Sequence, residues 1–337
     1  MSRYAETYKP SNLAGPGDAR PTALQIIKDE GLTGKLSDKV FLVTGVSSGI
    51  GIETLRALHT TGAHVFGTVR NLPKGQKVVS DILSENHKTG GKITLLEIDT
   101  ANLATVRAGA KAFLEQSDRL NAIIANAGIM AVPEGKTVDG FELQFGTNHL
   151  GHFLLFQLLK DVLLSSATPE YPSRYVSVSS KATQWGTVRT HDYGFEKEPY
   201  NEWAAYGQSK TANVWMSNYI ERKFGAQNLH STSLHPGGIM TGLGAHLDMA
   251  DFDTPELRAC LKSPAQGAAT QVYAAVGQEW THKGGVYLSD CAPARSYEEM
   301  EKEGLPKDWN DGYASWSYNP EGEEQLWKDS LKFVGLA

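Results

Sequence analysis

Tyr206 and Lys210 are the two residues of this chain whose types and spacing most directly suggest acid–base chemistry. They are four residues apart on a predicted helix, so their side chains project from the same face. An ammonium near a phenol favours the phenolate, which lowers the phenol pKa from about 10 toward the working range of a general acid or base. Because a long helix can contain such a pair by chance, these two residues alone do not exclude a solvated pair.

A glycine-rich segment, TGVSSGIG at residues 44–51, is the second candidate for chemistry. It follows a short apolar run and precedes a stretch with helical spacing. Gly45 permits a tight turn, Gly49 lets the backbone approach an anion, and Gly51 lets the helix pack on the sheet. The free N–H groups at the start of the helix face the anion. The context predicts the pyrophosphate site of a dinucleotide in preference to an ordinary glycine turn.

The end of the next predicted strand indicates which dinucleotide binds. NAD-binding proteins place an acidic residue about 20 residues beyond the glycines, whereas this chain has Val69 and Arg70 and no carboxylate in VFGTVRN. An arginine pairs with a 2′-phosphate through two charge-assisted hydrogen bonds, and an aspartate would repel it. The sequence therefore favours NADP(H), with a solvated surface arginine as the alternative.

Short apolar strands alternate with amphipathic helices along most of the chain. Such an alternation requires right-handed crossovers and a mostly parallel sheet that is covered on both faces. We therefore predict an α/β protein with a single doubly wound (Rossmann) domain of about seven mostly parallel strands. The predicted strands are 39–45, 63–70, 92–99, 121–128, 174–180, 229–237 and 284–290, and the predicted helices are 49–62, 73–88, 102–116, 148–164, 206–225 and 264–277.

This alternation divides the chain into an N-terminal arm (1–35), a catalytic domain (36–292) and a C-terminal extension (293–337). Residues 1–22 are rich in Pro, Gly and Ser, which is typical of a flexible or draped segment. Residues 181–203 and a substrate loop, 239–262, interrupt the alternation. The extension is aromatic, so it is a candidate cover for a pocket or for a partner chain. Its aromatic residues are Trp309, Tyr313, Trp316, Tyr318 and Trp327.

Composition excludes several classes of function. Of 337 residues, 32 are Lys or Arg and 38 are Asp or Glu, so the net charge is 32 − 38 = −6. This acidic balance argues against a nucleic-acid partner. Cys260 and Cys291 are too few for a disulfide scaffold or a four-thiolate metal site, which favours a reducing, cytoplasmic location. No apolar run reaches the ~18 residues of a membrane span, and the N-terminus lacks a signal-peptide pattern.

His149 and His152 lie three residues apart on one predicted helix. No further histidine or acidic residue lies near them in sequence. We therefore expect a structural or solvent-facing pair, and no metal.

Further motifs follow the glycine loop along the chain: Asp99-Thr100, Asn126-Ala127-Gly128, Asn148, Ser180, and Pro236-Gly237 with Thr241. With TGVSSGIG and the tyrosine–lysine pair, they resemble the short-chain dehydrogenase/reductase superfamily over about residues 36–292. The resemblance implies that Asp99-Thr100 contacts the adenine side of the cofactor and that the segment 236–241 flanks the nicotinamide. Ala125 departs from the family pattern, which usually has asparagine there, and this puts one local sheet hydrogen bond in doubt. Three details resemble the branch of retinol dehydrogenases, WW-domain oxidoreductases and their fungal relatives: Arg70, the gap of 206 − 180 = 26 residues from Ser180 to Tyr206, and GGVYLSDC at 284–291.

The resemblance implies a catalytic tetrad of Asn148, Ser180, Tyr206 and Lys210. Tyr206 exchanges a proton with a carbonyl or alcohol oxygen, Lys210 lowers the tyrosine pKa and binds the nicotinamide ribose, and Ser180 holds the developing oxyanion. Asn148 anchors a water that connects Lys210 to solvent. The implied NADP(H) contacts are Gly45, Ser47, Ser48, Gly49, Ile50, Gly51, Arg70, Asn71, Asp99, Thr100, Asn126, Ala127, Gly128, Tyr206, Lys210, Pro236, Gly237, Ile239 and Thr241.

The function that follows is NADP(H)-dependent hydride transfer to or from a lipophilic ketone, aldehyde or secondary alcohol, with secondary metabolism as a candidate setting. Candidate substrate walls are Met130, Ala182, Trp185, Trp203 and Leu243, each with ordinary packing as its alternative. Leu243, Leu247, Met249 and Phe252 fit either a mobile lid or a short docked helix. A homodimer through the helices that carry Asn148 and Tyr206 is what the family suggests.

Two other functions are compatible with this fold. One is a non-catalytic NADP(H)-sensing protein, which would usually lack the tyrosine or the lysine. The other is an enzyme that reduces double bonds or catalyses epimerisation. The retained tetrad favours carbonyl and alcohol chemistry over both.

Overall fold

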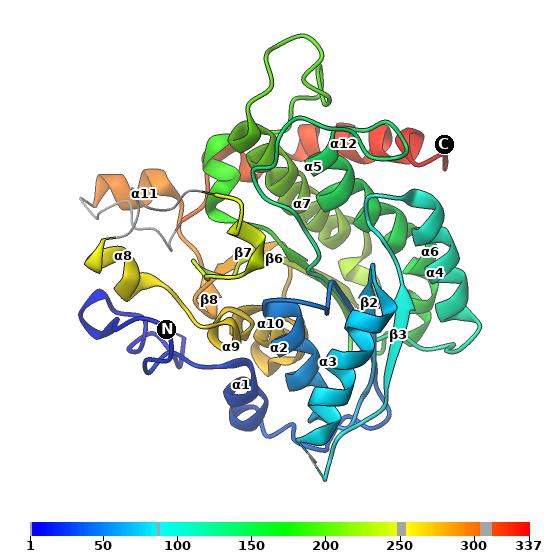
Figure 1. Cartoon of the computed structure of the whole chain (residues 1–337), viewed down its shortest axis with the longest axis vertical. Coiled ribbons are helices and arrows are strands. Elements are labelled where there is room, and N and C mark those ends of the chain that lie inside the picture. The colour runs from blue at the N-terminus through cyan, green and yellow to red at the C-terminus, as the bar shows by residue number, and fades with distance from the viewer. Residues whose placement is uncertain (1, 86–87, 248–253, 304–311) are drawn as a thin grey trace.

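An eight-stranded sheet forms the centre of the computed structural model, which describes residues 2–85, 88–247, 254–303 and 312–337 (Figure 1). Its order is β3-β2-β1-β4-β5-β6-β7-β8, parallel throughout except for β8, which pairs antiparallel with β7. The predicted doubly wound, mostly parallel sheet is confirmed. The strands are β1 (Val40–Thr44), β2 (His64–Val69), β3 (Ile93–Glu97), β4 (Ala122–Ala125), β5 (Ser173–Val178), β6 (Leu229–His235), β7 (Val286–Ser289) and β8 (Ala292–Pro293).

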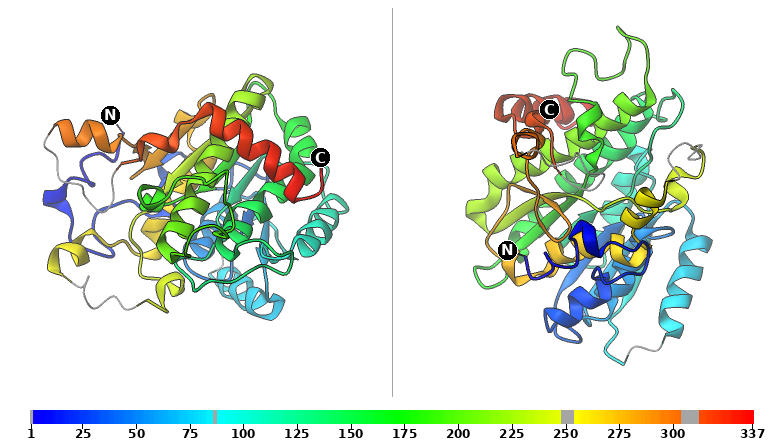
Figure 2. Two further views of the ribbon diagram at one scale, coloured as in Figure 1. Left: turned by 90° about the horizontal axis from the view of Figure 1, so that it is seen from above. Right: turned by 90° about the vertical axis from the view of Figure 1, so that its left-hand side faces the viewer.

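Helices cover both faces of the sheet (Figures 1 and 2). Alternate residues of a strand point to opposite faces, so Phe41 and Val43 join one apolar core and Leu42 joins the other. On the first face lie α1 (Ala23–Asp29), α2 (Ile50–His59), α3 (Leu72–Ser84), α9 (Pro264–Gly267) and α10 (Ala269–Val276). On the second lie α4 (Leu103–Leu114), α5 (Leu143–Phe145), α6 (Gly151–Ser166), α7 (Glu202–Phe224) and α12 (Pro320–Phe333). The remaining helices, α8 (Pro255–Cys260) and α11 (Tyr297–Lys302), lie at the end of the molecule that also holds the N-terminal arm.

The helix predicted over 148–164 begins earlier and is interrupted. α5 passes into a π turn, Gly146–Leu150, before α6 begins. Asn148 lies in that turn, and its side chain bonds to the backbone of Ile129 on a different segment. An added residue in a helical turn is frequent at functional sites, and here it occurs at a residue predicted to be catalytic.

α7 carries Tyr206 and Lys210 and is buried on almost every side. A helix in such a position needs a cover on its outer side as well as on the side that faces the sheet. That cover is α12, which lies across α7 (Figure 2). The indole of Trp215 on α7 donates to the Trp316 carbonyl, which lies just before α12.

Trp327 is the main contact of α12 with the helices beneath it. Its ring stacks on Tyr219 of α7, with centroids 4.3 Å apart, and meets Phe153 and Phe156 of α6 edge-on. The aromatic extension therefore fills the groove between α6 and α7 of its own chain. Trp309, predicted as part of this extension, lies outside the described residues.

The position of α12 bears on the expected homodimer. A dimer through the helices that carry Asn148 and Tyr206 uses the outer surfaces of α6 and α7, and α12 occupies the groove between them.

We therefore expect the chain to be a monomer in solution. Size-exclusion chromatography with light scattering should give the mass of one chain across a wide concentration range. A chain that ends before Pro320 is the matched comparison, since removal of α12 exposes apolar residues and should cause association. A full-length dimer whose interface maps to α6 and α7 would contradict this expectation.

Candidate active site

Several of the predicted site segments follow four neighbouring strands, β1, β4, β5 and β6, at one edge of the sheet. Because all four are parallel, their carboxyl ends meet there. The segments that leave these ends are the glycine loop 44–51, residues 126–128, Ser180 with the turn that follows it, and residues 236–241. Segments far apart in sequence are thus brought to one place.

The glycine loop is shaped for a bound anion. Gly45 has φ +74°, and a Cβ there would lie 2.9 Å from the Ala127 Cα atom; a Cβ at Gly51 would collide with the Gly45 carbonyl oxygen. Gly49 precedes α2 and provides no side-chain cap for it. No N-cap side chain therefore accepts a hydrogen bond from the first backbone N–H groups of α2. This arrangement suits a bound pyrophosphate. Ser47 and Ser48 lie in the turn between β1 and α2, and Ile50 is the first residue of α2.

A hydroxyl joins the glycine loop to the end of β4. Thr44 Oγ1 accepts hydrogen bonds from the backbone N–H groups of Asn126 and Ala127, both at 2.9 Å. The Asn126 amide donates in return to the Thr44 carbonyl at 2.8 Å. The departure at Ala125 leaves the sheet intact there, since Ala125 pairs in register with Ser177 of β5.

Asn148 is held by three side-chain hydrogen bonds. Its Oδ1 accepts from the Ile129 N–H, and its Nδ2 donates to the Ile129 carbonyl and to Ser209 Oγ, each at 2.9 Å. A Cβ at Gly128 would lie 3.0 Å from the same Oδ1 and 3.4 Å from Lys210 Nζ. The segment 126–128 therefore passes directly beside the predicted tetrad.

His152 contacts the same asparagine, a role that the sequence did not reveal. Its Nδ1 lies 2.8 Å from the Asn148 carbonyl oxygen and its Nε2 lies 2.8 Å from Thr44 Oγ1. Burial lowers the pKa of this imidazole to about 4, so it is neutral near pH 7. The predicted structural role is confirmed for His152, and His149 is buried too, beside Ser330 of α12 at 2.9 Å. The two rings thus bond to different elements, and neither faces solvent.

Ser180, Tyr206 and Lys210 come together as predicted. The Ser180 hydroxyl accepts from the Ala182 N–H at 3.1 Å and lies near enough to the Tyr206 phenol to act on its pKa. Lys210 Nζ lies 5.7 Å from the centre of the Tyr206 ring and donates to the Val178 carbonyl at 3.1 Å. Both the phenol and the ammonium are buried.

The electrostatics of this pair differ from the sequence prediction. Burial raises the pKa of Tyr206 to about 12, although the neighbouring Ser180 hydroxyl acts in the lowering direction. Burial also lowers the pKa of Lys210 to about 8. The expected lowering of the phenol pKa by the lysine is therefore absent, because loss of water around the phenol dominates the pKa of Tyr206.

The residues predicted to bind the adenosine half lie at the ends of β2 and β3. Arg70 is exposed directly after β2. Asn71 is the N-cap of α3, and its side chain accepts from the Lys74 N–H at 2.9 Å. Asp99 accepts from the Ala101 N–H at 3.0 Å, and Thr100 is buried beside it. Arg70 is thus exposed to an approaching ligand, whereas the Asn71 side chain already caps a helix.

Residues 236–241 follow β6 and reach the glycine loop. A Cβ at Gly49 would lie 3.4 Å from the Thr241 methyl group, and Ile239 packs beside Ile50 and Gly267. Lys262, which sequence reasoning missed, donates to the Pro236 carbonyl at 3.1 Å. A single lysine in an irregular segment carries no pattern that could have revealed this contact.

The predicted substrate residues fall into two groups. Trp185 and Trp203 meet edge-on with centroids 5.0 Å apart, and Trp203 lies 6.4 Å from the Tyr206 ring. Met130 and Leu247 both approach Gly244, and Leu243 is exposed in the same 3₁₀ turn, Gly242–Gly244. Ala182 is buried behind Ser180. Met249 and Phe252 of the predicted lid lie outside the described residues.

Neither a metal cluster nor a membrane helix occurs in the part of the chain that the structure describes. Within those ranges, no three or more His, Cys, Asp or Glu side chains are arranged to hold a metal ion. No helix among the same residues has the length and apolarity that a bilayer crossing requires.

Comparison with known proteins places these features in context. Residues 39–251 match the family described as short chain dehydrogenase. The protein "Short-chain dehydrogenase/reductase prx1" of Penicillium roqueforti is 47% identical over 99% of this chain and 96% of its own length. "Retinol dehydrogenase 14" of Homo sapiens is 34% identical over 93% of this chain and 91% of its own length. A crystal structure of an uncharacterized protein from Mycobacterium paratuberculosis has a TM-score of 0.64 and 28% identity, and covers 96% of this chain and 98% of that chain.

The low pKa of Lys210 predicts a pH-dependent stability of the cofactor-free protein. Native Lys210 releases its proton near pH 8, whereas an unfolded lysine keeps it to about pH 10.5. The unfolded state therefore binds more protons between these values, and this residue makes stability rise with pH. Wild type should gain on the order of 1 to 2 kcal/mol in unfolding free energy over Lys210→Met between pH 8 and pH 9.5, as measured by urea unfolding. Lys283→Met, on the surface, should show the wild-type slope; equal slopes for Lys210→Met and wild type would contradict the prediction.

Proposed function

The chain belongs to the short-chain dehydrogenase family, and from this we propose that it is an NADP(H)-dependent oxidoreductase of lipophilic carbonyl compounds or alcohols. The observation that carries the proposal is the buried group of Ser180, Tyr206 and Lys210 at the sheet edge, beside a glycine loop that suits a pyrophosphate. NADP(H) would supply the hydride when bound, and the protein's own groups move the proton.

Tyr206 is the proton donor in the reducing direction. With a pKa of about 12 the phenol keeps its proton at neutral pH, so it can deliver that proton to a carbonyl oxygen as negative charge develops there. The Ser180 hydroxyl, close enough to the phenol to act on its pKa, can donate to the same oxygen. In the oxidising direction the phenolate must form first, and that requires a nearby positive charge.

Lys210 provides that positive charge. Its ammonium is still mostly protonated at pH 7, because its pKa is about 8. A pKa so close to neutrality also lets it take up and release protons during turnover. We propose that a water held near Asn148 links this ammonium to solvent, since Asn148 and Lys210 both lie against Gly128.

The preference for NADP(H) rests on Arg70. It is exposed at the end of β2, next to the strand that leads into the glycine loop, and no carboxylate lies in VFGTVRN to bind a ribose diol. A guanidinium there can bind the 2′-phosphate of NADP(H) with two hydrogen bonds.

The substrate class rests on the apolar surroundings of the phenol. Trp185, which is 47% exposed, and Trp203 lie on one side of Tyr206. Large exposed aromatic surface next to a reactive group suits an apolar ligand. A relative at 34% identity carries the name retinol dehydrogenase, which is consistent with a lipophilic alcohol or aldehyde.

Replacement of the phenol oxygen tests the proposed chemistry. Tyr206→Phe should lower kcat at least about 100-fold against hydrophobic ketones and aldehydes, because it removes the proton donor. Cofactor affinity should stay within about twofold. Tyr219→Phe, on the same helix, is the control and should keep wild-type kcat. Tight NADPH binding by wild type without turnover of any carbonyl would instead favour a nucleotide-sensing protein.

Charge reversal at Arg70 tests the cofactor preference. Arg70→Asp should weaken NADPH binding and strengthen NADH binding, so that the ratio of the two dissociation constants shifts at least about tenfold toward NADH. Isothermal titration calorimetry measures both. Arg119→Asp, on the surface just before β4, should leave the ratio unchanged. A ratio that is unaffected by Arg70→Asp would show that the arginine does not select the cofactor.

A further inference from the structure

One buried lysine, Lys262, lies along the segment 236–239. Its ammonium donates to the Pro236 carbonyl at 3.1 Å, and its backbone N–H donates to the Gly238 carbonyl at 2.8 Å. A parallel bridge between Lys262 and Ile239 extends that backbone contact. Gly237, with φ +103°, lies against the lysine stem, so that a Cβ there would be 2.7 Å from Nζ and 2.8 Å from Cε. The segment that reaches the glycine loop is therefore supported by this one residue.

The ammonium of Lys262 is itself fixed from two other directions. Its side chain is fully buried, and Nζ pairs with Asp290 at 2.6 Å in the turn between β7 and β8. The ring of Tyr8, from the N-terminal arm, has its centre 5.1 Å from Nζ. A buried charge that meets a carboxylate, a carbonyl and an aromatic face has little freedom to move.

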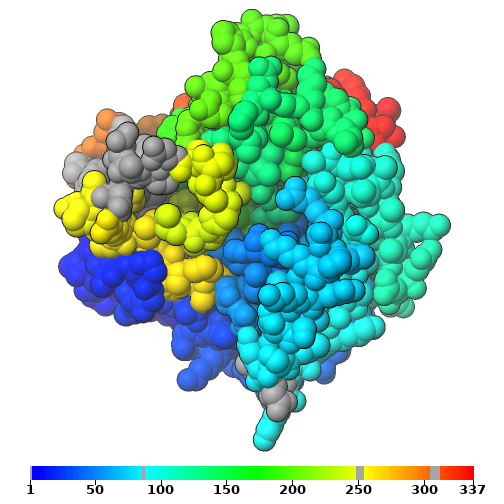
Figure 3. Space-filling view, viewed as in Figure 1, coloured from blue at the N-terminus to red at the C-terminus, as the bar shows by residue number. Residues whose placement is uncertain are grey.

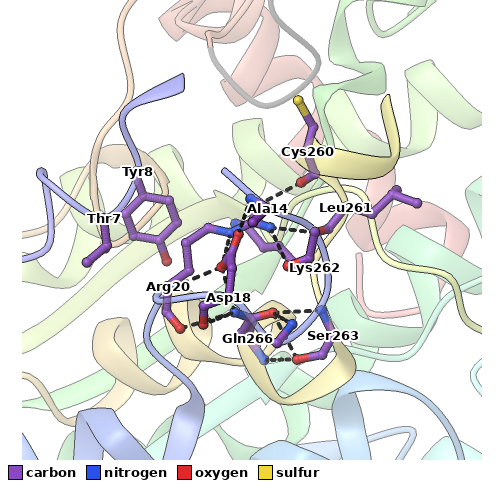
Figure 4. Close-up of polar contacts among 12 residues, drawn as sticks. Thr7, Tyr8, Ala14, Asp18, Arg20, Cys260, Leu261, Lys262, Ser263 and Gln266 are labelled. Carbon is purple, nitrogen blue, oxygen red and sulfur yellow. Dashed lines mark hydrogen bonds and ion pairs between the residues drawn. The ribbon is translucent and has the colours of Figure 1, made fainter. Parts of the chain in front are cut away.

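The N-terminal arm also fixes the turn that carries Lys262 (Figure 4). The buried guanidinium of Arg20 pairs with Asp18 at 2.8 Å and donates to the carbonyls of Cys260 and Leu261 at 2.7 and 2.5 Å. Gln266 donates to the Asp18 carboxylate at 3.0 Å. In the space-filling view the arm, in blue, lies directly against the yellow residues of this region (Figure 3).

We propose that Lys262 is a positioning residue for the nicotinamide half of the cofactor, and that the N-terminal arm holds it in place through Tyr8. The inference rests on the proposed function, because the family resemblance is what assigns residues 236–241 to the nicotinamide. Lys262 contacts the backbone of that segment and acts on the cofactor only through it. The adenosine half, at Arg70 beyond β2, lies away from this support.

Lys262→Met tests the proposal, because it keeps the apolar stem and removes the charge and its hydrogen bonds. Calorimetry on the full-length chain should give at least a tenfold weaker Kd for NADPH, with the Kd for 2′,5′-ADP, its adenosine half, within twofold of wild type. If the wild-type protein binds NADH more tightly than NADPH, then NADH replaces NADPH and 5′-AMP replaces 2′,5′-ADP in the same comparison. Lys283→Met, which loses an exposed lysine beside Glu279 and Trp280, is the matched control and should change neither constant.

The outcomes separate positioning from general damage. Equal losses for the dinucleotide and its adenosine half would indicate a purely structural lysine and overturn the proposal, as would unchanged NADPH binding. Wild-type protein that binds neither dinucleotide would refute the proposed function and this inference with it. Wild-type binding with an unaffected Lys262→Met variant would refute this inference alone.

A second variant serves if Lys262→Met does not fold. Asp290→Asn removes only the charge of the partner, and asparagine tolerates the left-handed backbone at this position, φ +53°. It should weaken NADPH binding about threefold or more and leave 2′,5′-ADP binding unchanged; no change in NADPH affinity would overturn the proposal.

The role of the arm is tested by a double-mutant cycle with Tyr8→Leu. If Tyr8 acts through Lys262, the double variant should bind NADPH no more weakly than Lys262→Met alone. Additive losses would show that the arm affects cofactor binding by another route, and would overturn that part of the proposal.

Discussion

The Thr44 hydroxyl is the point at which the separate parts of the site are joined. It accepts the N–H groups of Asn126 and Ala127, so its own hydrogen is directed to His152 Nε2. That assignment leaves a hydrogen on Nδ1 of the neutral imidazole, which donates to the Asn148 carbonyl. One side chain at the end of β1 thus connects the glycine loop, the end of β4 and the π turn that holds Asn148. The separation of the glycine loop from Asn148 follows from these few bonds.

Burial governs the chemistry of the site more than the pairing of charges does. Tyr206 and Lys210 belong to a helix that is enclosed on almost all sides, and loss of water raises the phenol pKa and lowers that of the ammonium. The two pKa values shift in opposite directions, and each shift favours the uncharged form of its group, as the loss of water requires. α12, from the far end of the chain, covers the C-terminal part of this helix, with Trp327 packed between α6 and α7. The C-terminal helix therefore decides which surface of α6 and α7 is available for association.

The two chain ends have complementary structural roles around one sheet. The C-terminal helix closes the face that carries α6 and α7, whereas the N-terminal arm bonds to the turn between α8 and α9 at the other end of the site. The arm does this mainly through Arg20, whose guanidinium satisfies backbone carbonyls that a short helix leaves without partners. Both contacts join residues more than 100 positions apart in sequence.

Local pattern in the sequence was sufficient to predict the strand–helix alternation and the glycine loop, whereas the grouping of Ser180 with Tyr206 and Lys210 came from the family resemblance. The local pattern was sufficient for these features because each depends on the spacing of residues within one or two helices or strands. The π turn at Asn148, the cover of α7 by α12, and the contacts of His152 and Lys262 depend on partners remote in sequence, and no local spacing encodes them. The raised pKa of Tyr206 belongs to the same class: the sequence places an ammonium one helical turn away, but only the packed structure determines how much water remains around the phenol.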